Sequence, residues 1–400
     1  MPPTIADTTP MTSTKANRIE SKLLRRINER RLLEVIQHKG PLSRAALARV
    51  SGLTAPTVSK AVDSLLTRGF IEEIDPPEQL LGRPGKLVRM AVESAAVIGI
   101  SIDTHVCCVV SAGLDGVVTE DRTRRFVTPT DYDALIDALE SRCHELLDGI
   151  PGKVHGIGVC APGLVNDRLG EIVFCPNLHL LDKRNPARDL EARLAVKAIL
   201  FQEIDGLCLS ESMYGVARSL NDFALLDVSI GLGMGMMCSG RLFGGRSGMA
   251  GELGHITVNP TGVRCGCGNH GCLETLATDA ALVRLISEKD GISRSFNEVA
   301  TALDERPAEY EHEVSTASEY LAIAIAAVIN VCNPTMLFVH GTLLVTNEER
   351  FARVLKLVKN RTLTASLAEC TIVPTKSSKR QAAVAGIVHH LTSEWAPAIP

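Results

Sequence analysis

The sequence has few aromatic residues and shows no segment that would hold it in a membrane. Only 4% of its 400 residues are Phe, Trp or Tyr, so Leu, Val, Ile and Ala must build most of the core. The N-terminus MPPTIADTTPMTSTKANR lacks the apolar stretch of a signal peptide. We also find no run of roughly 18 apolar residues that would indicate a membrane-spanning helix. We therefore expect a cytoplasmic protein with no membrane partner.

Disulfides are not expected either, although the chain has 12 cysteines. Most of them stand singly in apolar segments, as Cys160, Cys208, Cys238 and Cys332 do. Isolated cysteines of this kind behave as small buried hydrophobic residues in a reducing compartment. Only the three cysteines between 265 and 272 lie close together.

Charge is distributed unevenly along the chain. The formal net charge is −4, but the segment from Lys15 to Arg89 carries 15 Lys and Arg against 8 Asp and Glu. A basic N-terminal part on an acidic body indicates that a polyanion is the partner of the first part only. The length predicts two or three domains.

The first 90 residues have the pattern of a helix-turn-helix. A helix is expected over 19–38, and Gly40 and Pro41 end it. Ser43 is a suitable N-cap for a short helix that Gly52 can end, and Thr54 is a suitable cap for the next, with Pro56 in its first turn. This third helix carries an apolar stripe at Val58, Val62, Leu65 and Leu66. Its other face would enter the major groove of DNA.

Two strands are expected around a loop after Gly69, which would make the module a winged variant. An Arg held between Gly and Pro at the loop tip can reach a narrow minor groove. The alternative is a helical hairpin used for dimerisation. The segment resembles the winged helix-turn-helix of bacterial repressors. The residues expected to contact DNA are Thr54, Thr57, Ser59, Lys60 and Ser64 of the helix, and Arg83 and Lys86 of the wing.

From Ala95 onward the pattern is that of an α/β body. Strands, then a helix, then strands occur twice, which predicts two lobes with a cleft between them. Ligands of such sheets bind where strand ends meet loops. The last third is mainly helical and contains one strand over 336–340.

Several motifs in this body resemble those of the ROK family, which holds bacterial sugar kinases and their repressor relatives on an actin-like, hexokinase-like fold. The motifs are APG at 161–163, PNL at 176–178, EID at 203–205, GLGMG at 231–235 and GELGHITVNPTGVRCGCGNHGCLE at 251–274. The resemblance divides the chain into a flexible tail (1–17), a winged helix-turn-helix (18–90) and a ROK effector and oligomerisation domain (95–400) with lobes at about 95–205 and 206–400.

The most specific of these motifs has the composition of a metal site. His255, Cys265, Cys267 and Cys272 offer one imidazole and three thiolates, a set that zinc favours in closed tetrahedral sites. Four protein ligands leave no position for water, so the Zn²⁺ would be structural. A redox-active or unliganded cysteine cluster is the alternative.

The resemblance also implies a sugar site beside the metal. In the family, residues matching Glu252, His255 and Glu274 contact sugar hydroxyls, and the metal-bound loop would hold them in place. Asn177 and Asp205 complete the expected set, with Asp205 matching the family's catalytic Asp. Plain surface charge is the alternative for Glu252 and Glu274, and an acidic turn residue without a ligand is the alternative for Asp205.

The sequence argues against sugar phosphorylation. The phosphate cradle after the first strand retains Asp103 but has His105 and Val106 where the kinases have glycines. In the second phosphate loop Leu232 replaces a Thr hydroxyl, and the loop after the late strand keeps only Gly341. Ile204 replaces an amide that binds sugar. We therefore expect a non-enzyme.

These features predict a sugar-responsive repressor of carbohydrate uptake or catabolism genes. Its expected partners are double-stranded operator DNA and a sugar or sugar phosphate, and it should be a homodimer or homotetramer. The alternatives are an active ATP-dependent sugar kinase carrying a DNA-binding head, and a regulator controlled by a partner such as a sugar-transport protein.

Overall fold

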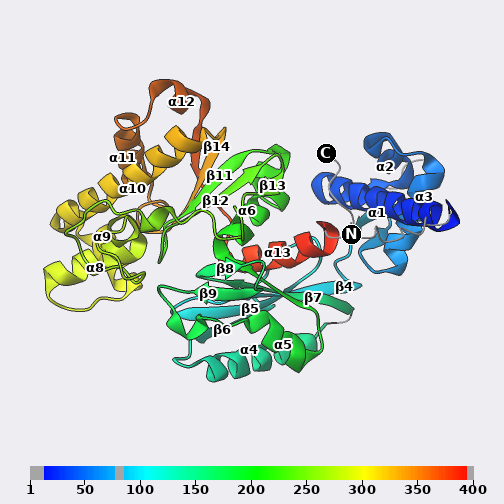
Figure 1. Ribbon diagram of the computed structural model, residues 1–400, viewed down its shortest axis with the longest axis horizontal. Helices are drawn as coiled ribbons and strands as arrows, with labels where there is room; N and C mark the ends of the chain where they lie inside the picture. Colours follow the sequence, from blue (N-terminus) through cyan, green and yellow to red (C-terminus); the bar gives the residue numbers. More distant parts are fainter. Residues whose placement is uncertain (1–12, 77–84, 151, 394–400) are drawn as a thin grey trace, which may run out of the picture.

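The chain forms two α/β lobes and a small N-terminal module that lies beside the first lobe (Figure 1). The computed structural model describes residues 13–76, 85–150 and 152–393. The predicted wing residue Arg83 and residues 1–12 of the predicted tail lie outside this part of the chain. Helix α1 begins at Ser13, so residues 13–17 of the predicted tail are helical.

The N-terminal module packs three helices on an antiparallel sheet with the strand order β1-β3-β2. Its elements are α1 (Ser13–Lys39), β1 (Leu42–Ser43), α2 (Arg44–Ser51), α3 (Ala55–Thr67), β2 (Ile71–Ile74) and β3 (Leu87–Met90). Three helices followed by a β-hairpin are the order of a winged helix-turn-helix. The predicted fold of this module is therefore confirmed.

Residues next in sequence mark the starts and ends of the short helices of this module, with one exception. The Ser43 hydroxyl accepts a hydrogen bond from the Ala46 N–H at 3.2 Å and so caps α2. Gly52 ends that helix with a φ of 69°, in the left-handed region that favours glycine. Thr54 precedes α3, but its hydroxyl bonds that of Thr57 at 2.9 Å and no backbone N–H. The predicted side-chain cap at Thr54 is therefore wrong.

The first lobe is built on a five-stranded sheet with the order β10-β7-β4-β5-β6. Strands β4, β7 and β10 run parallel to one another, β5 is antiparallel to β4, and the edge strand β6 is antiparallel to β5. Helices α4 and α5 cover one face, and α6 with the C-terminal α13 covers the other (Figure 1). The elements are β4 (Ala95–Ser101), β5 (Val106–Ala112), β6 (Thr123–Val127), α4 (Tyr132–Leu147), β7 (Lys153–Ala161), the hairpin β8 (Leu164–Asn166) and β9 (Glu171–Phe174), the 3-10 turn η1 (His179–Leu181), α5 (Pro186–Leu194), β10 (Ala198–Gln202), α6 (Glu203–Met213) and η2 (Val216–Ser219).

The second lobe repeats this topology with the order β13-β12-β11-β14-β15. Strands β11, β14 and β15 run parallel to one another, β12 is antiparallel to β11, and the edge strand β13 is antiparallel to β12. The elements are β11 (Phe223–Asp227), β12 (Gly233–Cys238), β13 (Arg241–Leu242), η3 (Leu253–His255), α7 (Glu274–Ala277), α8 (Asp279–Asp290), α9 (Phe296–Glu305), η4 (Pro307–Tyr310), α10 (Glu311–Cys332), β14 (Met336–His340), α11 (Glu348–Lys359), α12 (Thr364–Glu369), β15 (Thr371–Pro374) and α13 (Lys379–Ser393). Two sheets of one topology confirm the prediction of a two-lobed α/β body.

One described helical segment, Pro307–Cys332, is long and apolar enough to cross a membrane by length and composition. The sequence analysis did not identify it. In the structure 56% of its most apolar window is buried. Leu321, Ile325 and Ile329 lie in the core of the second lobe, so this segment, which includes α10, is the central helix of that core.

The C-terminal helix α13 returns from the second lobe to the first and reaches the N-terminal module (Figure 1). Val384 and Val388 are buried in the same cluster as Leu32 and Leu33 of α1 and Val97 of β4. The module therefore shares one continuous core with the first lobe and with α13.

Candidate ligand cleft, metal centre and nucleic-acid interface

A cavity of about 110 Å³ opens between the two lobes where the strand ends of both sheets meet. It is lined by loops that follow β4, β7, β10 and β11, by the metal-type loop and by the start of α13. Four of the five residues expected to contact a ligand lie on it, namely Asn177, Glu252, His255 and Glu274. Gly231 lies beside two of these residues and leaves space between them, because a Cβ at this position would lie 3.3 Å from both Asn177 Nδ2 and Glu274 Oε2.

The fifth, Asp205, does not line the cavity. Glu203 and Ile204 are the first two residues of α6 and line the cleft. Asp205 is the third residue of this helix. Burial, together with the nearby carboxylate of Asp167, raises the pKa of Asp205 to about 7. The carboxylate that α6 brings to the lining of this cavity is therefore that of Glu203, and a ligand contact by Asp205 stays a prediction.

The inner wall of the cleft holds a lysine that the sequence analysis missed. Lys379 Nζ, at the first residue of α13, lies 2.9 Å from Asp103 Oδ2, 3.1 Å from Glu203 Oε2 and 3.8 Å from Asp227 Oδ2. Asp103 and Glu203 belong to the first lobe and Asp227 to the second, so one ammonium group joins both lobes. No local pattern announces this cluster, because Lys379 and Asp103 are 276 positions apart.

The pKa shifts of this cluster follow from burial and from the lysine. Burial raises the pKa of Glu203 to about 7, although Lys379 acts in the opposite direction. Burial also acts to raise the pKa of Asp227, but Lys379 and His340 hold it well below its usual range. Burial lowers the pKa of Lys379, but the surrounding carboxylates raise it more. The net increase keeps the ammonium group charged.

Glu203 has one oxygen without a partner. Oε2 accepts a hydrogen bond from Lys379, whereas Oε1 is buried and has no hydrogen-bond partner among the described residues. A buried carboxylate oxygen without a donor costs free energy.

The same cluster bears on nucleotide chemistry. Mg²⁺-nucleotide sites use carboxylates that are free to hold the metal ion. Here Asp103 is paired with Lys379 and also accepts a hydrogen bond from Thr104 Oγ1 at 3.2 Å. His105, in the turn before β5, and Val106, the first residue of β5, have exposed side chains.

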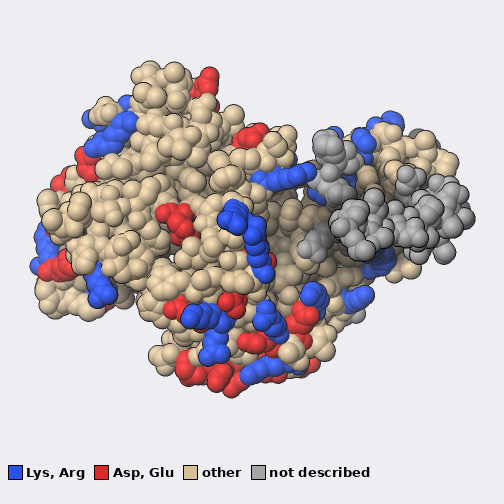
Figure 2. All heavy atoms as spheres, viewed as in Figure 1, with Lys and Arg blue, Asp and Glu red and all other residues tan. Residues whose placement is uncertain are grey.

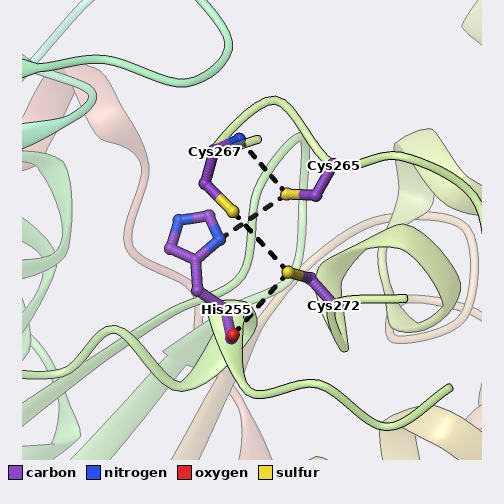
Figure 3. A group of neighbouring side chains, drawn as sticks. All are labelled: His255, Cys265, Cys267 and Cys272. Atoms are coloured by element: carbon purple, nitrogen blue, oxygen red, sulfur yellow. Dashed lines mark hydrogen bonds between the residues drawn. The ribbon is translucent and has the colours of Figure 1, made fainter. Parts of the chain in front are cut away.

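The metal-type residues converge on one point (Figure 3). The ligand atoms of His255, Cys265, Cys267 and Cys272 all lie within 4.8 Å of one another. Cys267 Sγ and Cys272 Sγ are 3.6 Å apart, and Cys265 Sγ is 3.7 Å from His255 Nδ1. Sulfur atoms bound to one tetrahedral Zn²⁺ at about 2.3 Å stand about 3.8 Å apart, whereas a disulfide requires about 2.05 Å. The donor set and its spacing therefore fit a metal ion.

His255 faces the metal-type cluster and the cleft at once. Its Nδ1 points to Cys265, whereas its Nε2 lies 3.6 Å from Glu252 Oε2. Glu274 Oε1 lies 2.9 Å from Cys265 Sγ. If a metal ion bound Nδ1, the Nε2 proton would remain free to donate a hydrogen bond to Glu252. The second ring nitrogen of a metal-bound histidine commonly donates to a neighbouring carboxylate in this way.

Two glycines let the metal loop fold against its surroundings. A Cβ on Gly271, where φ is 62°, would lie 1.5 Å from the Asn259 carbonyl oxygen. A Cβ on Gly266 would lie 2.4 Å from the Pro176 carbonyl oxygen. The loop of the second lobe therefore packs on the first lobe next to Asn177.

The predicted DNA-contacting residues of α3 do not share one face. Thr57, Lys60 and Ser64 line a groove beside α1 together with Arg25. Ser64 Oγ accepts a hydrogen bond from Arg25 Nη2 at 2.7 Å. Ser59 faces the other side, where its hydroxyl lies 3.2 Å from Arg44 Nη1.

Basic side chains surround this module. Thr54 and Lys60 are exposed at α3, and Lys86 is exposed at the base of the wing. Lys86 lies 3.9 Å from Glu73. On the face seen in Figure 2, the charged side chains that are visible on the module are mostly blue, whereas the first lobe mixes blue and red.

Comparisons with known proteins agree with this architecture. The model of the ROK family matches residues 97–393, and that of the MarR family matches residues 24–79. The chain is 25% identical to the xylose repressor of Bacillus subtilis over 331 residues, which cover 81% of this chain and 84% of that protein. It is 26% identical to the DNA-binding transcriptional dual regulator NagC of Escherichia coli over 379 residues, covering 90% and 91% of the two chains.

Solved structures share the fold. A ROK family transcriptional regulator described as a homologue of the E. coli MLC protein superposes with a TM-score of 0.77 at 23% identity, covering 92% of this chain and 97% of that one. A ROK family glucokinase from Streptomyces griseus, in complex with glucose and AMPPNP, has a TM-score of 0.66 at 20% identity and covers 74% of this chain and 98% of its own. The family model spans both lobes and the cleft, and the chain therefore belongs to the ROK family.

Proposed function

We propose that this chain is a transcriptional repressor of carbohydrate uptake or catabolism genes, and that a sugar in the cleft controls its binding to operator DNA. Relatives of nearly the same length carry the names xylose repressor and N-acetylglucosamine repressor. The N-terminal module supplies a DNA reader, and the cavity supplies a place for a small polyhydroxylated ligand.

Helix α13 is the observation that carries this proposal. Its first residue, Lys379, pairs with carboxylates in the cleft. At its last residue, the Ser393 carbonyl oxygen accepts a hydrogen bond from Arg30 Nη1 of α1 at 3.3 Å. Fifteen residues at 1.5 Å each make one rigid element of about 22 Å between the two sites.

Close packing would let α13 transmit a displacement. A Cβ on Gly386 would lie 2.1 Å from the Phe201 ring, and one on Gly158 would lie 2.4 Å from the Ala383 carbonyl oxygen. The helix is thus held against β7 and β10 with no spare room. A ligand that changes the contacts of Glu203 would shift Lys379, and α13 would carry that shift to α1.

The remaining parts of the proposal follow from the same geometry. Zn²⁺ would be structural, since four protein ligands close its coordination. The protein would not be a kinase, because Lys379 engages the carboxylates that a metal-nucleotide would need. It would act in the cytoplasm as a homodimer or homotetramer, since paired reading heads match palindromic half-sites.

The test is selection of genomic DNA fragments on the full-length protein, followed by sequencing. Enrichment of a few palindromic sites next to sugar-utilisation genes supports the proposal. Absence of enrichment at low as well as moderate salt contradicts it, and release of ADP from ATP with a hexose panel would then favour the kinase.

A further inference from the structure

We propose that the acidic lining of the cleft selects an unphosphorylated sugar, and that the Lys379 ammonium group, already paired with carboxylates, occupies the position that a divalent metal ion would take. This inference names the ligand class and rests on the proposed sugar-binding function.

The lining of the cavity is strongly acidic. Five carboxylate side chains lie on it, and Lys379 is the only Lys or Arg among the lining residues in the described part of the chain. The carboxylates are Asp103, Glu203, Asp227, Glu252 and Glu274. A phosphorylated ligand needs free cationic donors, usually Arg or Lys, to compensate its charge.

Lys379 is already engaged by carboxylates. An ammonium group has three N–H donors. Two of them are used by Asp103 at 2.9 Å and Glu203 at 3.1 Å, and Asp227 Oδ2 lies 3.8 Å from Nζ, within ion-pair distance. His340, the other basic group of this cluster, lies on the second lobe and has its Nδ1 2.9 Å from Asp227 Oδ1.

The outer wall offers no free positive charge either. His255 lies between Glu252 and the thiols. Three thiolates and one Zn²⁺ leave the metal centre with a formal charge of −1 when it is loaded. At an effective dielectric constant near 20, one uncompensated pair of like charges at about 5 Å already weakens binding by about a hundredfold.

Sugar hydroxyls fit the same wall well. They donate to carboxylate oxygens, and the buried Glu203 Oε1 lacks a donor. They also accept from amides, which Asn177 and Gln202 bring to the cavity. Hydroxyls therefore satisfy the wall without bringing a charge into it.

Lys379 also explains why the inner carboxylates need no metal ion. Three carboxylates from two lobes, facing one point, form an arrangement that would hold a hard divalent cation. The ammonium group occupies that point.

The first experiment compares matched pairs of ligands by calorimetry on the full-length, zinc-loaded protein. The pairs are glucose, mannose and N-acetylglucosamine with their 6-phosphates, and xylose and glucosamine are added as unpaired sugars. We expect binding by at least one unphosphorylated sugar, and at least a hundredfold weaker binding by any phosphorylated partner.

Each other outcome has a distinct meaning. Tighter binding of a 6-phosphate overturns the inference and leaves the proposed function standing. Binding of no member of the panel contradicts both, and the fragment selection then shows whether DNA recognition survives without a sugar.

The second experiment probes the cation position with Mn²⁺, followed by electron paramagnetic resonance. We expect the wild type to leave Mn²⁺ free and Lys379→Met to bind about one ion, because the thiolate site prefers zinc. Tight Mn²⁺ binding by the wild type in the cleft, abolished by Asp103→Asn, would overturn the inference.

A double variant keeps the second test valid if Lys379→Met does not fold. Lys379→Met/Glu203→Gln has the same net charge in the cluster as the wild type. It must bind Mn²⁺ through Asp103 and Asp227, and failure of the folded double variant to do so counts against the inference.

Discussion

Asp205→Asn is expected to stabilise the protein above neutral pH. The pKa of Asp205 is raised from 3.8 to about 7 by burial and by the neighbouring Asp167. A carboxyl with a raised pKa in the folded state costs stability once the pH exceeds its unfolded pKa, because the unfolded chain ionises first. The cost grows between about pH 4 and pH 7 and is constant above that range.

The magnitude follows from the shift. About three pKa units correspond to about 4 kcal/mol at 1.36 kcal/mol per unit. Asp205 also lies in the first turn of α6, where the helix dipole favours a negative charge by up to about 1 kcal/mol. The expected gain from Asp205→Asn is therefore about 3 kcal/mol at pH 8 and close to zero at pH 4.

Chemical denaturation at pH 4, 6 and 8 measures this difference. Asp133→Asn is the matched control, since Asp133 also lies in the first turn of a helix, α4, but is exposed. We expect the control to change stability by less than about 0.5 kcal/mol at every pH. Equal midpoints for Asp205→Asn and wild type at pH 8, or a less stable variant, would refute the reasoning and return Asp205 to a binding role.

Three further predictions concern the metal, the DNA and the C-terminal helix. The purified protein should contain about one zinc ion per chain. Cys265→Ser should lose this zinc and unfold at a lower temperature, whereas the control Cys238→Ser should keep it. A wild-type protein free of zinc would contradict the proposed metal site. Lys60→Ala should weaken operator binding and reduce the slope of log K against log[salt] by about 1. An unchanged slope in a filter-binding series would show that this exposed lysine contacts no phosphate. Gly386→Ala should push α13 away from Phe201 and weaken the effect of sugar on DNA affinity at least threefold in anisotropy assays. Gly149→Ala is the control, because the added methyl group there would make only ordinary contact, and an undiminished sugar effect in Gly386→Ala would exclude α13 as the connection.

Much of the fold could be predicted because its signals are local. Ser43 and Gly52 bound α2, and the strand over 336–340 lies where the sequence indicates. The four metal-type residues span only 18 positions, so their convergence was also within reach of sequence reasoning.

The parts that were not predicted depend on contacts between distant segments. Lys379 meets Asp103 and Glu203 only after α13 returns to the first lobe. Asp205 and Glu203 are two positions apart, and the start of α6 decides which of them faces the cleft. Ser59 and Ser64 belong to one helix, but α2 engages the first and α1 the second.

The most direct test of the account is the affinity of the full-length protein for its selected operator, measured by fluorescence anisotropy with and without a saturating sugar. The account predicts at least a tenfold change for the wild type. For Glu203→Gln, which alters the buried carboxylate of the cleft, it predicts little change. A sugar that binds the wild type by calorimetry but leaves its operator affinity unchanged would contradict the claim that the cleft controls the DNA-binding module.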